Sequence, residues 1–159
     1  MHTEPQKEHQ WLQRMVGEWT IETEASMEPG APPMTYRGTE RARSLGGLWV
    51  ICEGEGDTPG GTSHNIITLG YDVDRKRFVG TFVGSTMTYM WVYEGHMDPS
   101  GQKIVLDTEG PSFTEMGRMG KYRDTFEIVS DDHRTLSSSY QDQEGQWHRF
   151  MTSHYRRVK

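Results

Sequence analysis

Acidic and phenolic side chains around one irregular stretch are the residues of this chain best suited to acid–base chemistry. They are Asp107, Glu109, Tyr122 and Asp124, which flank residues 110–120. A carboxyl or phenol group serves as a general acid or base when an enclosed site shifts its pKa toward neutrality. Residues 110–120 interrupt the surrounding pattern and are placed to form a lid over a cavity. The sequence therefore allows an enzyme that acts on a small molecule, provided that one of these groups faces inward.

Rings and thioethers gathered in the middle of the chain suit a different task, the lining of an apolar cavity. Aromatic residues keep a period of two through residues 76–97, and methionines cluster close by in the sequence. Methionine adapts its shape to apolar ligands. The alternative is that these side chains only pack a core. We predict the cavity lining to be Phe82, Tyr89, Trp91, Tyr93, Met119, Tyr122 and Phe126.

The histidines and serines form no pattern that marks a metal site or a nucleophile. The 7 His residues include no His-Glu-x-x-His pattern and no close pair with a third obvious ligand. A site assembled from separate strands, such as His64 with His96, stays open as an alternative. No histidine carries a haem-binding signal, no Gly-x-Ser-x-Gly motif occurs, and no glycine-rich loop precedes a helix. We expect no metal and no cofactor.

The spacing of apolar residues along the chain predicts the helix and strands that must position these side chains. Residues 6–16 carry apolar side chains on one face of a short predicted helix, which ends at Gly17. The period then becomes two, which is typical of half-buried strands. The first strand alternates from Trp19 to Met27, and a turn at 28–33 ends it. Further strands are predicted near residues 34–44, 47–56, 63–72, 76–84, 87–97, 102–109, 121–130, 134–141 and 146–156.

The number of strands favours a closed sheet. About ten strands with tight turns and no intervening helices predict an antiparallel up-and-down meander, and about ten are many for an open twisted sheet. Closure into a barrel removes the exposed edges. Gly80, Gly84 and Gly95 lie inside strand patterns, where either strong curvature or the close approach of a ligand or of another backbone segment explains them. We predict one all-β domain over residues 1–159, a barrel with a short N-terminal helix, with a two-sheet sandwich as the alternative architecture.

Two resemblances strengthen the barrel prediction. The motif Gly17-Glu18-Trp19, at the start of the first strand and just after the helix, resembles the signature of lipocalins and related calycins. In those families the tryptophan plugs the closed end of the barrel and a basic side chain of the last strand packs over it, which implies Arg156 or Arg157 here. We take Arg156 as the partner of the Trp19 plug. Guanidinium over indole is a favourable cation–π pair, worth roughly 0.5–2 kcal/mol.

A second resemblance is carried by residues 8–12, 17–19, 46–50, 70–72, 93–95 and 109–111. With these segments the whole chain resembles a bacterial family of uncharacterised lipocalin-like domains. The resemblance implies a barrel of the lipocalin or fatty-acid-binding-protein kind, and no settled activity comes with it.

Charge and composition limit the partners and the location. With 23 acidic and 17 basic residues, the net charge of −6 argues against nucleic acid. The single cysteine, Cys52, lies in an apolar run and excludes an internal disulfide, and we interpret it as a buried thiol. No apolar run approaches the roughly 20 residues of a transmembrane helix, so we expect no membrane partner. The first residues lack the hydrophobic region of a secretory signal peptide, so we expect a cytoplasmic location.

These observations rank three hypotheses. The first is a barrel that binds a small, largely apolar molecule in its interior. The second is an enzyme that uses the same cavity. The third is an interaction module that works as an oligomer, such as a homodimer, through outward tryptophan and methionine side chains.

Overall fold

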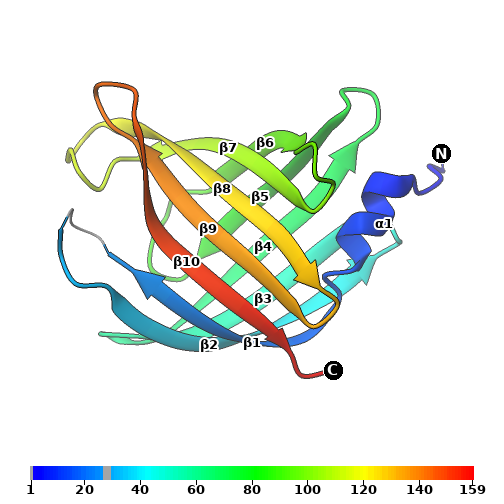
Figure 1. Cartoon of the computed structure of the whole chain (residues 1–159), viewed down its shortest axis with the longest axis horizontal. Helices are drawn as coiled ribbons and strands as arrows, with labels where there is room; N and C mark the ends of the chain where they lie inside the picture. The colour runs from blue at the N-terminus through cyan, green and yellow to red at the C-terminus, as the bar shows by residue number, and fades with distance from the viewer. Residues whose placement is uncertain (1, 27–29) are drawn as a thin grey trace.

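The computed structural model describes residues 2–26 and 30–159, which form a closed barrel with one short helix (Figure 1). Helix α1 spans Lys7–Gln13. The strands are β1 Gly17–Ala25, β2 Met34–Leu45, β3 Trp49–Thr58, β4 Gly61–Asp72, β5 Arg77–Gly84, β6 Trp91–Met97, β7 Lys103–Pro111, β8 Met119–Ser130, β9 His133–Gln141 and β10 Trp147–Arg157. Each strand pairs antiparallel with the next along the chain, and β10 pairs with β1. The predicted all-β, up-and-down barrel with a short N-terminal helix is confirmed.

Most strand bounds follow the hydrophobic period to within two residues, and the largest difference lies at the end of the barrel opposite α1. The predicted strand 87–97 begins only at Trp91, because residues 85–90 form a turn and a loop. Strands β7 and β8 run further than predicted, so the irregular stretch shrinks to residues 112–118. The predicted end of the first strand at Met27, and part of its turn, lie outside the described residues.

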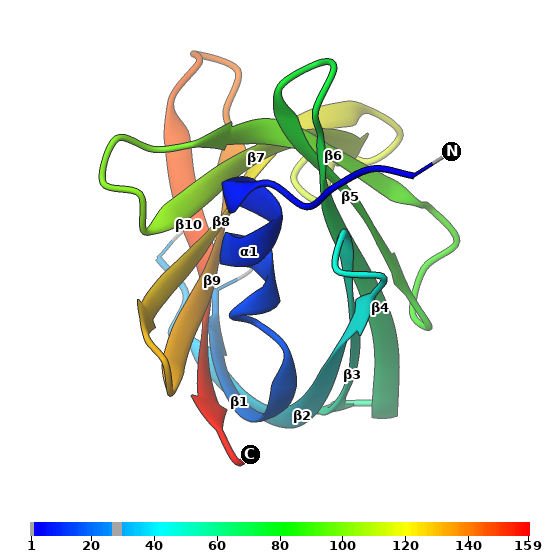
Figure 2. The same cartoon turned by 90° about the vertical axis from the view of Figure 1, so that its right-hand side faces the viewer.

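Helix α1 and the apolar core occupy one end of the barrel. Figure 2 shows α1 lying across this end, within the ring of strands. Trp11 of α1 packs edge-on against Phe78 of β5, with 6.2 Å between ring centroids. His9 joins the helix to β4, because its Nε2 lies 3.0 Å from the carbonyl oxygen of Tyr71. Leu12 and Met15 are almost completely buried beneath the helix. The apolar face predicted from the sequence is therefore the face that caps the barrel.

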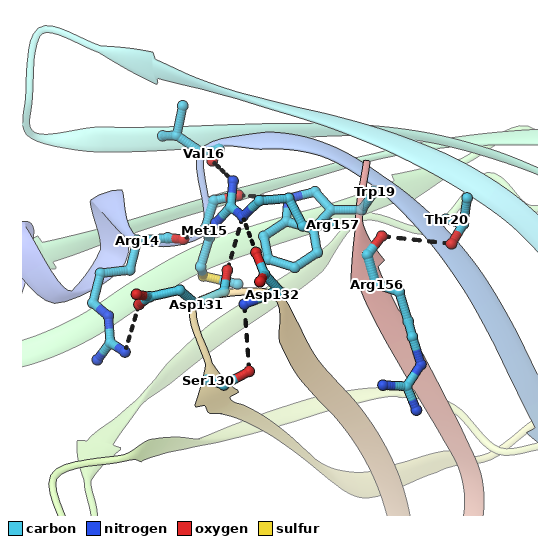
Figure 3. Close-up of polar contacts among 10 residues, drawn as sticks. All are labelled: Arg14, Met15, Val16, Trp19, Thr20, Ser130, Asp131, Asp132, Arg156 and Arg157. Atoms are coloured by element: carbon cyan, nitrogen blue, oxygen red, sulfur yellow. Dashed lines mark hydrogen bonds and ion pairs between the residues drawn. The ribbon is translucent and has the colours of Figure 1, made fainter. Parts of the chain in front are cut away.

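Trp19 plugs this same end. Its side chain is 2% exposed, and its indole N–H donates a hydrogen bond to the carbonyl oxygen of Met15 at 2.9 Å. The guanidinium of Arg157 lies 4.3 Å from the centroid of the Trp19 ring. That guanidinium also donates to the carbonyl oxygens of Val16 and Arg14 (Figure 3). The helix end, the first strand and the last strand are thus tied together at one point.

The partner of Trp19 is Arg157, and not Arg156. Trp19 pairs with Arg157 across the β1–β10 ladder, so both side chains lie on the inner face. Arg156 pairs with Thr20 and is exposed, and Figure 3 shows its side chain directed away from Trp19. A one-residue shift along a strand moves a side chain to the opposite face. Gly17 completes the arrangement, because its φ of +143° is unfavourable for other residues and any side chain there would collide with Arg157.

A buried ion pair lies behind the plug and was not predicted from the sequence. The Arg134 guanidinium of β9 donates to the Glu40 carboxylate of β2, and the side chains are only 2% and 1% exposed. Arg134 also stacks over the rings of Trp19 and Tyr155, at 4.6 Å and 4.0 Å from their centroids. Burial and the nearby Glu40 carboxylate raise the pKa of the Cys52 thiol well above its usual value. The interpretation of Cys52 as a buried thiol is confirmed.

Removing one partner of this pair is expected to destabilise the protein strongly. Arg134→Ala leaves the Glu40 carboxylate buried without a cation, which costs about 3–5 kcal/mol of unfolding free energy. Arg41→Ala is the control, since Arg41 and Glu18 form an exposed pair that contributes less than about 1 kcal/mol. Urea denaturation followed by tryptophan fluorescence measures both variants. An Arg134→Ala variant as stable as the control would contradict the assignment.

Candidate ligand-binding site

A cavity occupies the barrel at the end opposite α1. Because the strands run up and down, the connections 85–90, 112–118 and 142–146 all lie at this end. The cavity has a volume of about 290 Å³, close to the lower limit of pockets that hold small molecules. Its lining consists of Phe82, Met87, Trp91, Tyr93, Thr108, Pro111, Phe113, Tyr122, Asp124, Leu136, Ser138, Phe150 and Met151.

Strand alternation brings most of these side chains inward. Residues two apart on one strand share a face, as Trp91 and Tyr93 do on β6. The β8–β9 register then places Asp124 directly beside Ser138. Strand β10 departs from simple alternation, because its register with β9 shifts between Arg149 and Met151. This irregularity is why the consecutive residues Phe150 and Met151 both line the cavity.

Aromatic rings packed against one another form most of the wall. The rings of Trp91 and Tyr122 are nearly perpendicular, at 88°, with 5.0 Å between centroids. Phe113 lies 5.0 Å from Phe150 by the same measure. Trp91 also covers Gly110 of β7 so closely that a methyl group at this glycine would collide with the indole. Gly110 therefore provides the space in which the indole lies.

The connection between β7 and β8 contributes Phe113 to this wall. The hydroxyl of Tyr122 donates to the carbonyl oxygen of Pro111 at 2.8 Å and accepts from the backbone N–H of Phe113 at 3.3 Å. The hydroxyl of Ser112 accepts from the backbone N–H of Glu115 at 3.0 Å. The stretch that the sequence offered as a candidate lid therefore lies against the cavity and is held by local hydrogen bonds.

A small polar group lies among the apolar walls. The hydroxyl of Tyr93 donates to Oδ2 of Asp124 at 2.6 Å, and the hydroxyl of Ser138 also bonds to this carboxylate. Burial raises the pKa of Asp124, although both hydrogen bonds oppose the shift. Burial and then the Asp124 charge raise the pKa of Tyr93 well above its usual value. The buried hydroxyl of Thr108 has no hydrogen-bond partner among the described residues.

A family model matches almost the entire chain. The model described as "Protein of unknown function (DUF1579)" covers residues 4–157. The chain belongs to the DUF1579 family. A comparison with curated proteins gives no match. Within the described part of this DUF1579 chain, no group of three potential metal ligands is close enough to hold an ion, and no helix is long and apolar enough to cross a membrane.

Solved structures share the barrel fold of this DUF1579 chain at low sequence identity. Rv2717c from M. tuberculosis is 12% identical, with a TM-score of 0.70 over 98% of this chain and 100% of that protein. The S-type phycobiliprotein lyase CPES from Guillardia theta is 15% identical, with a TM-score of 0.62 over 94% and 92%. A de novo designed fluorescence-activating β-barrel is 12% identical, with a TM-score of 0.50 over 92% and 95%. At these identities the likeness concerns the fold.

The structure brings together part of the lining set predicted from the sequence. Phe82, Trp91, Tyr93 and Tyr122 line the cavity. Phe126 is buried in the core, with its ring 6.1 Å from that of Tyr93.

Tyr89 and Met119 lie away from the cavity lining. Tyr89 precedes β6 and is outside its alternation, so its hydroxyl reaches the carbonyl oxygen of Glu109 instead. Met119 is 59% exposed, because it lies on the outward face of β8.

The candidate acid–base residues divide between the two faces of the sheet. Asp107 pairs with Arg123 at 2.9 Å, and this pair and Glu109 lie on the outer face. Tyr122 and Asp124 line the cavity. Sequence reasoning did not place eight further residues in the lining, which are Met87, Thr108, Pro111, Phe113, Leu136, Ser138, Phe150 and Met151. On β9 the signal for Leu136 and Ser138 is weak, since the run Ser137-Ser138-Ser139 conceals the alternation.

The raised pKa of Asp124 predicts a pH dependence of stability. The folded chain binds a proton at Asp124 more tightly than the unfolded chain, whose carboxyl pKa is near 3.8. The wild type therefore loses stability as the pH rises above this value through the folded pKa. Asp124→Asn removes this titration while keeping an oxygen acceptor. We expect the variant to gain stability relative to the wild type as the pH rises from 4 toward neutrality.

A companion variant checks the cause of this pH dependence. Tyr93→Phe removes the hydroxyl that donates to Asp124 and favours its charged form. It is expected to raise the Asp124 pKa further and to extend the loss of stability to higher pH. Urea denaturation at a series of pH values measures all three proteins. A stability difference between Asp124→Asn and wild type that stays constant with pH would refute the assignment.

Proposed function

We propose that this DUF1579 protein binds a small, largely apolar molecule in the cavity at the barrel end opposite α1. The cavity itself is the observation that carries the proposal. It combines aromatic walls with a few convergent polar groups, which is the usual composition of small-molecule sites. A volume of about 290 Å³ restricts the ligand to roughly the size of one or two fused rings.

The difference in packing between the two ends of the barrel supports this proposal. The apolar core lies near α1, where Leu12 and Val50 are fully buried. Rings at the opposite end surround empty space instead of filling it. The shared fold with a phycobiliprotein lyase and a fluorescence-activating design adds fold-level support. The proposal treats residues 1–159 as one domain acting in the cytoplasm, without a nucleic-acid or membrane partner. A homodimer stays an alternative.

A pair of methionine variants tests the proposal. Met151→Trp places a large ring in the cavity, whereas Met116→Trp adds the same ring at a fully exposed position outside it. We titrate indole and 2-naphthol as small aromatic ligands and follow the melting temperature. At a ligand concentration of 100 Kd, binding adds about 2.7 kcal/mol. For a chain of this size that raises Tm by roughly 5–10 °C.

The expected pattern is binding by wild type and Met116→Trp, and loss of binding in Met151→Trp. Native mass spectrometry of protein purified from cells adds an independent measurement. A bound small molecule is expected on wild type and on Met116→Trp, whose cavities are open, and not on Met151→Trp. Equal binding by both variants would place the ligand outside the cavity. Absence of binding by wild type, together with a ligand-free mass, would refute the proposed function.

A further inference from the structure

Apart from the hydroxyl of Thr108, which has no partner among the described residues, the polar hydrogens around the cavity are committed to protein acceptors. The indole N–H of Trp91 donates to the sulfur of Met87 at 3.2 Å. The hydroxyl of Tyr122 donates to the carbonyl oxygen of Pro111, and that of Tyr93 donates to Asp124. A ligand therefore meets acceptor atoms more often than free donors. This arrangement favours a ligand that brings its own N–H donors or a positive charge.

Asp124 has both spare acceptor capacity and an uncompensated charge. An ionised carboxylate can accept about four hydrogen bonds. Asp124 receives bonds from the neutral hydroxyls of Tyr93 and Ser138. No lysine, arginine or histidine of the described residues forms an ion pair with it; the adjacent Arg123 turns outward to Asp107 and Trp147. Asp124 is half-buried, and a charge largely removed from water without a counter-charge is unfavourable, so a cation in the cavity would stabilise it.

The titratable groups that face Asp124 do not supply that counter-charge. They are the phenols of Tyr93 on β6, Tyr122 on β8 and Tyr155 on β10. Burial raises the pKa of each of these phenols, so they stay neutral near pH 7. The other hydroxyls at the cavity, those of Thr108 and Ser138, carry no charge either. Positive charge must therefore come from a proton or from a ligand.

The aromatic walls provide a second attraction for positive charge. Phe82, Trp91, Phe113, Tyr122 and Phe150 surround the same space as Asp124. Ring faces attract cations electrostatically, and the attraction is stronger when water is excluded. Because Trp91 and Tyr122 meet at 88°, the face of one ring adjoins the edge of the other along this wall. A carboxylate among aromatic rings is an arrangement that recognises ammonium groups.

We propose that the cavity selects a compact organic cation, a protonated amine or quaternary ammonium on a small apolar body, with Asp124 as its counter-charge. The inference rests on the proposed function and names the ligand class for the same site. The ammonium group lies beside Asp124, and the apolar body fills the space among Phe82, Trp91 and Phe150. Anions are excluded, because they would meet the Asp124 carboxylate in a medium of low dielectric constant.

Three small molecules of nearly equal shape test this selection. They are 2-phenylethylamine, which is a cation at pH 7, neutral 2-phenylethanol and anionic phenylacetate. Titration followed by tryptophan fluorescence and calorimetry gives each Kd. Wild type is expected to bind the amine about tenfold or more tightly than the alcohol. Phenylacetate is expected to bind most weakly of the three.

Two matched carboxylate variants show whether Asp124 causes the preference. Asp124→Asn is expected to bring the amine and the alcohol to within about twofold of each other, because only the charged contact is lost. Asp107→Asn, which changes an exposed outer carboxylate, is expected to keep the preference of wild type. Urea denaturation verifies that both variants are folded.

Proton release gives a signature that a merely structural role of Asp124 would not produce. The bound cation lowers the pKa of Asp124, so wild type releases protons on binding the amine and not on binding the alcohol. Calorimetry in buffers of different ionisation enthalpy measures this release between pH 5 and 7. It is expected to be absent in Asp124→Asn.

The outcomes separate the two proposals. If wild type binds the alcohol as tightly as the amine, or if Asp124→Asn keeps the preference, the cation inference is overturned and the binding function stands. If wild type binds none of the three molecules, indole and 2-naphthol also fail to bind, and the purified protein has a ligand-free mass, the proposed function and the inference fall together.

Discussion

The stacking of Trp19 against two guanidinium groups is the interaction on which the closed end of the barrel depends. Arg157 and Arg134 bring β10 and β9 to the indole of β1, and the Glu40 carboxylate extends the contact to β2. A buried ion pair carries a large desolvation cost, which hydrogen bonds and ring contacts offset only in a well-fixed geometry. The cluster therefore joins β1, β2, β9 and β10 at one point, and the net stability it adds is smaller than the cost of removing one of its charges.

Fixing one end of the barrel in this way leaves the other end free to serve a different purpose. The helix, the plug and the apolar core give one half of the barrel a filled interior. Rings at the opposite end pack against one another and against loops, and leave a cavity between them. The carboxylate of Asp124 is tolerated there because neutral hydroxyls bond to it. The same strands thus provide the packed core at one end of the barrel and the proposed binding site at the other end.

The sequence allowed prediction of the fold, and of only part of the site, for physical reasons. A period of two, tight turns and the Gly17-x-Trp19 motif predict the closed meander, because each follows from local chain geometry. Cavity residues depend on register. Arg156 and Arg157 differ by one position and therefore face opposite sides of the sheet. The irregularity at Phe150 and Met151, and the pairing of Glu40 with Arg134 across 94 positions, leave no signal in a hydrophobic pattern.

The seam between β1 and β10 has a consequence for how the chain reaches its native state on the ribosome. The hydroxyls of Thr23 and Ser153 meet across it although 130 positions separate them in the chain. The edge of β1 that pairs with β10 consequently stays unpaired until nearly all of the polypeptide has been synthesised. Pairing at such separation is slow, and an unpaired edge is prone to self-association during that interval. Closure of the β1–β10 seam therefore also removes the edge at which incomplete chains could associate.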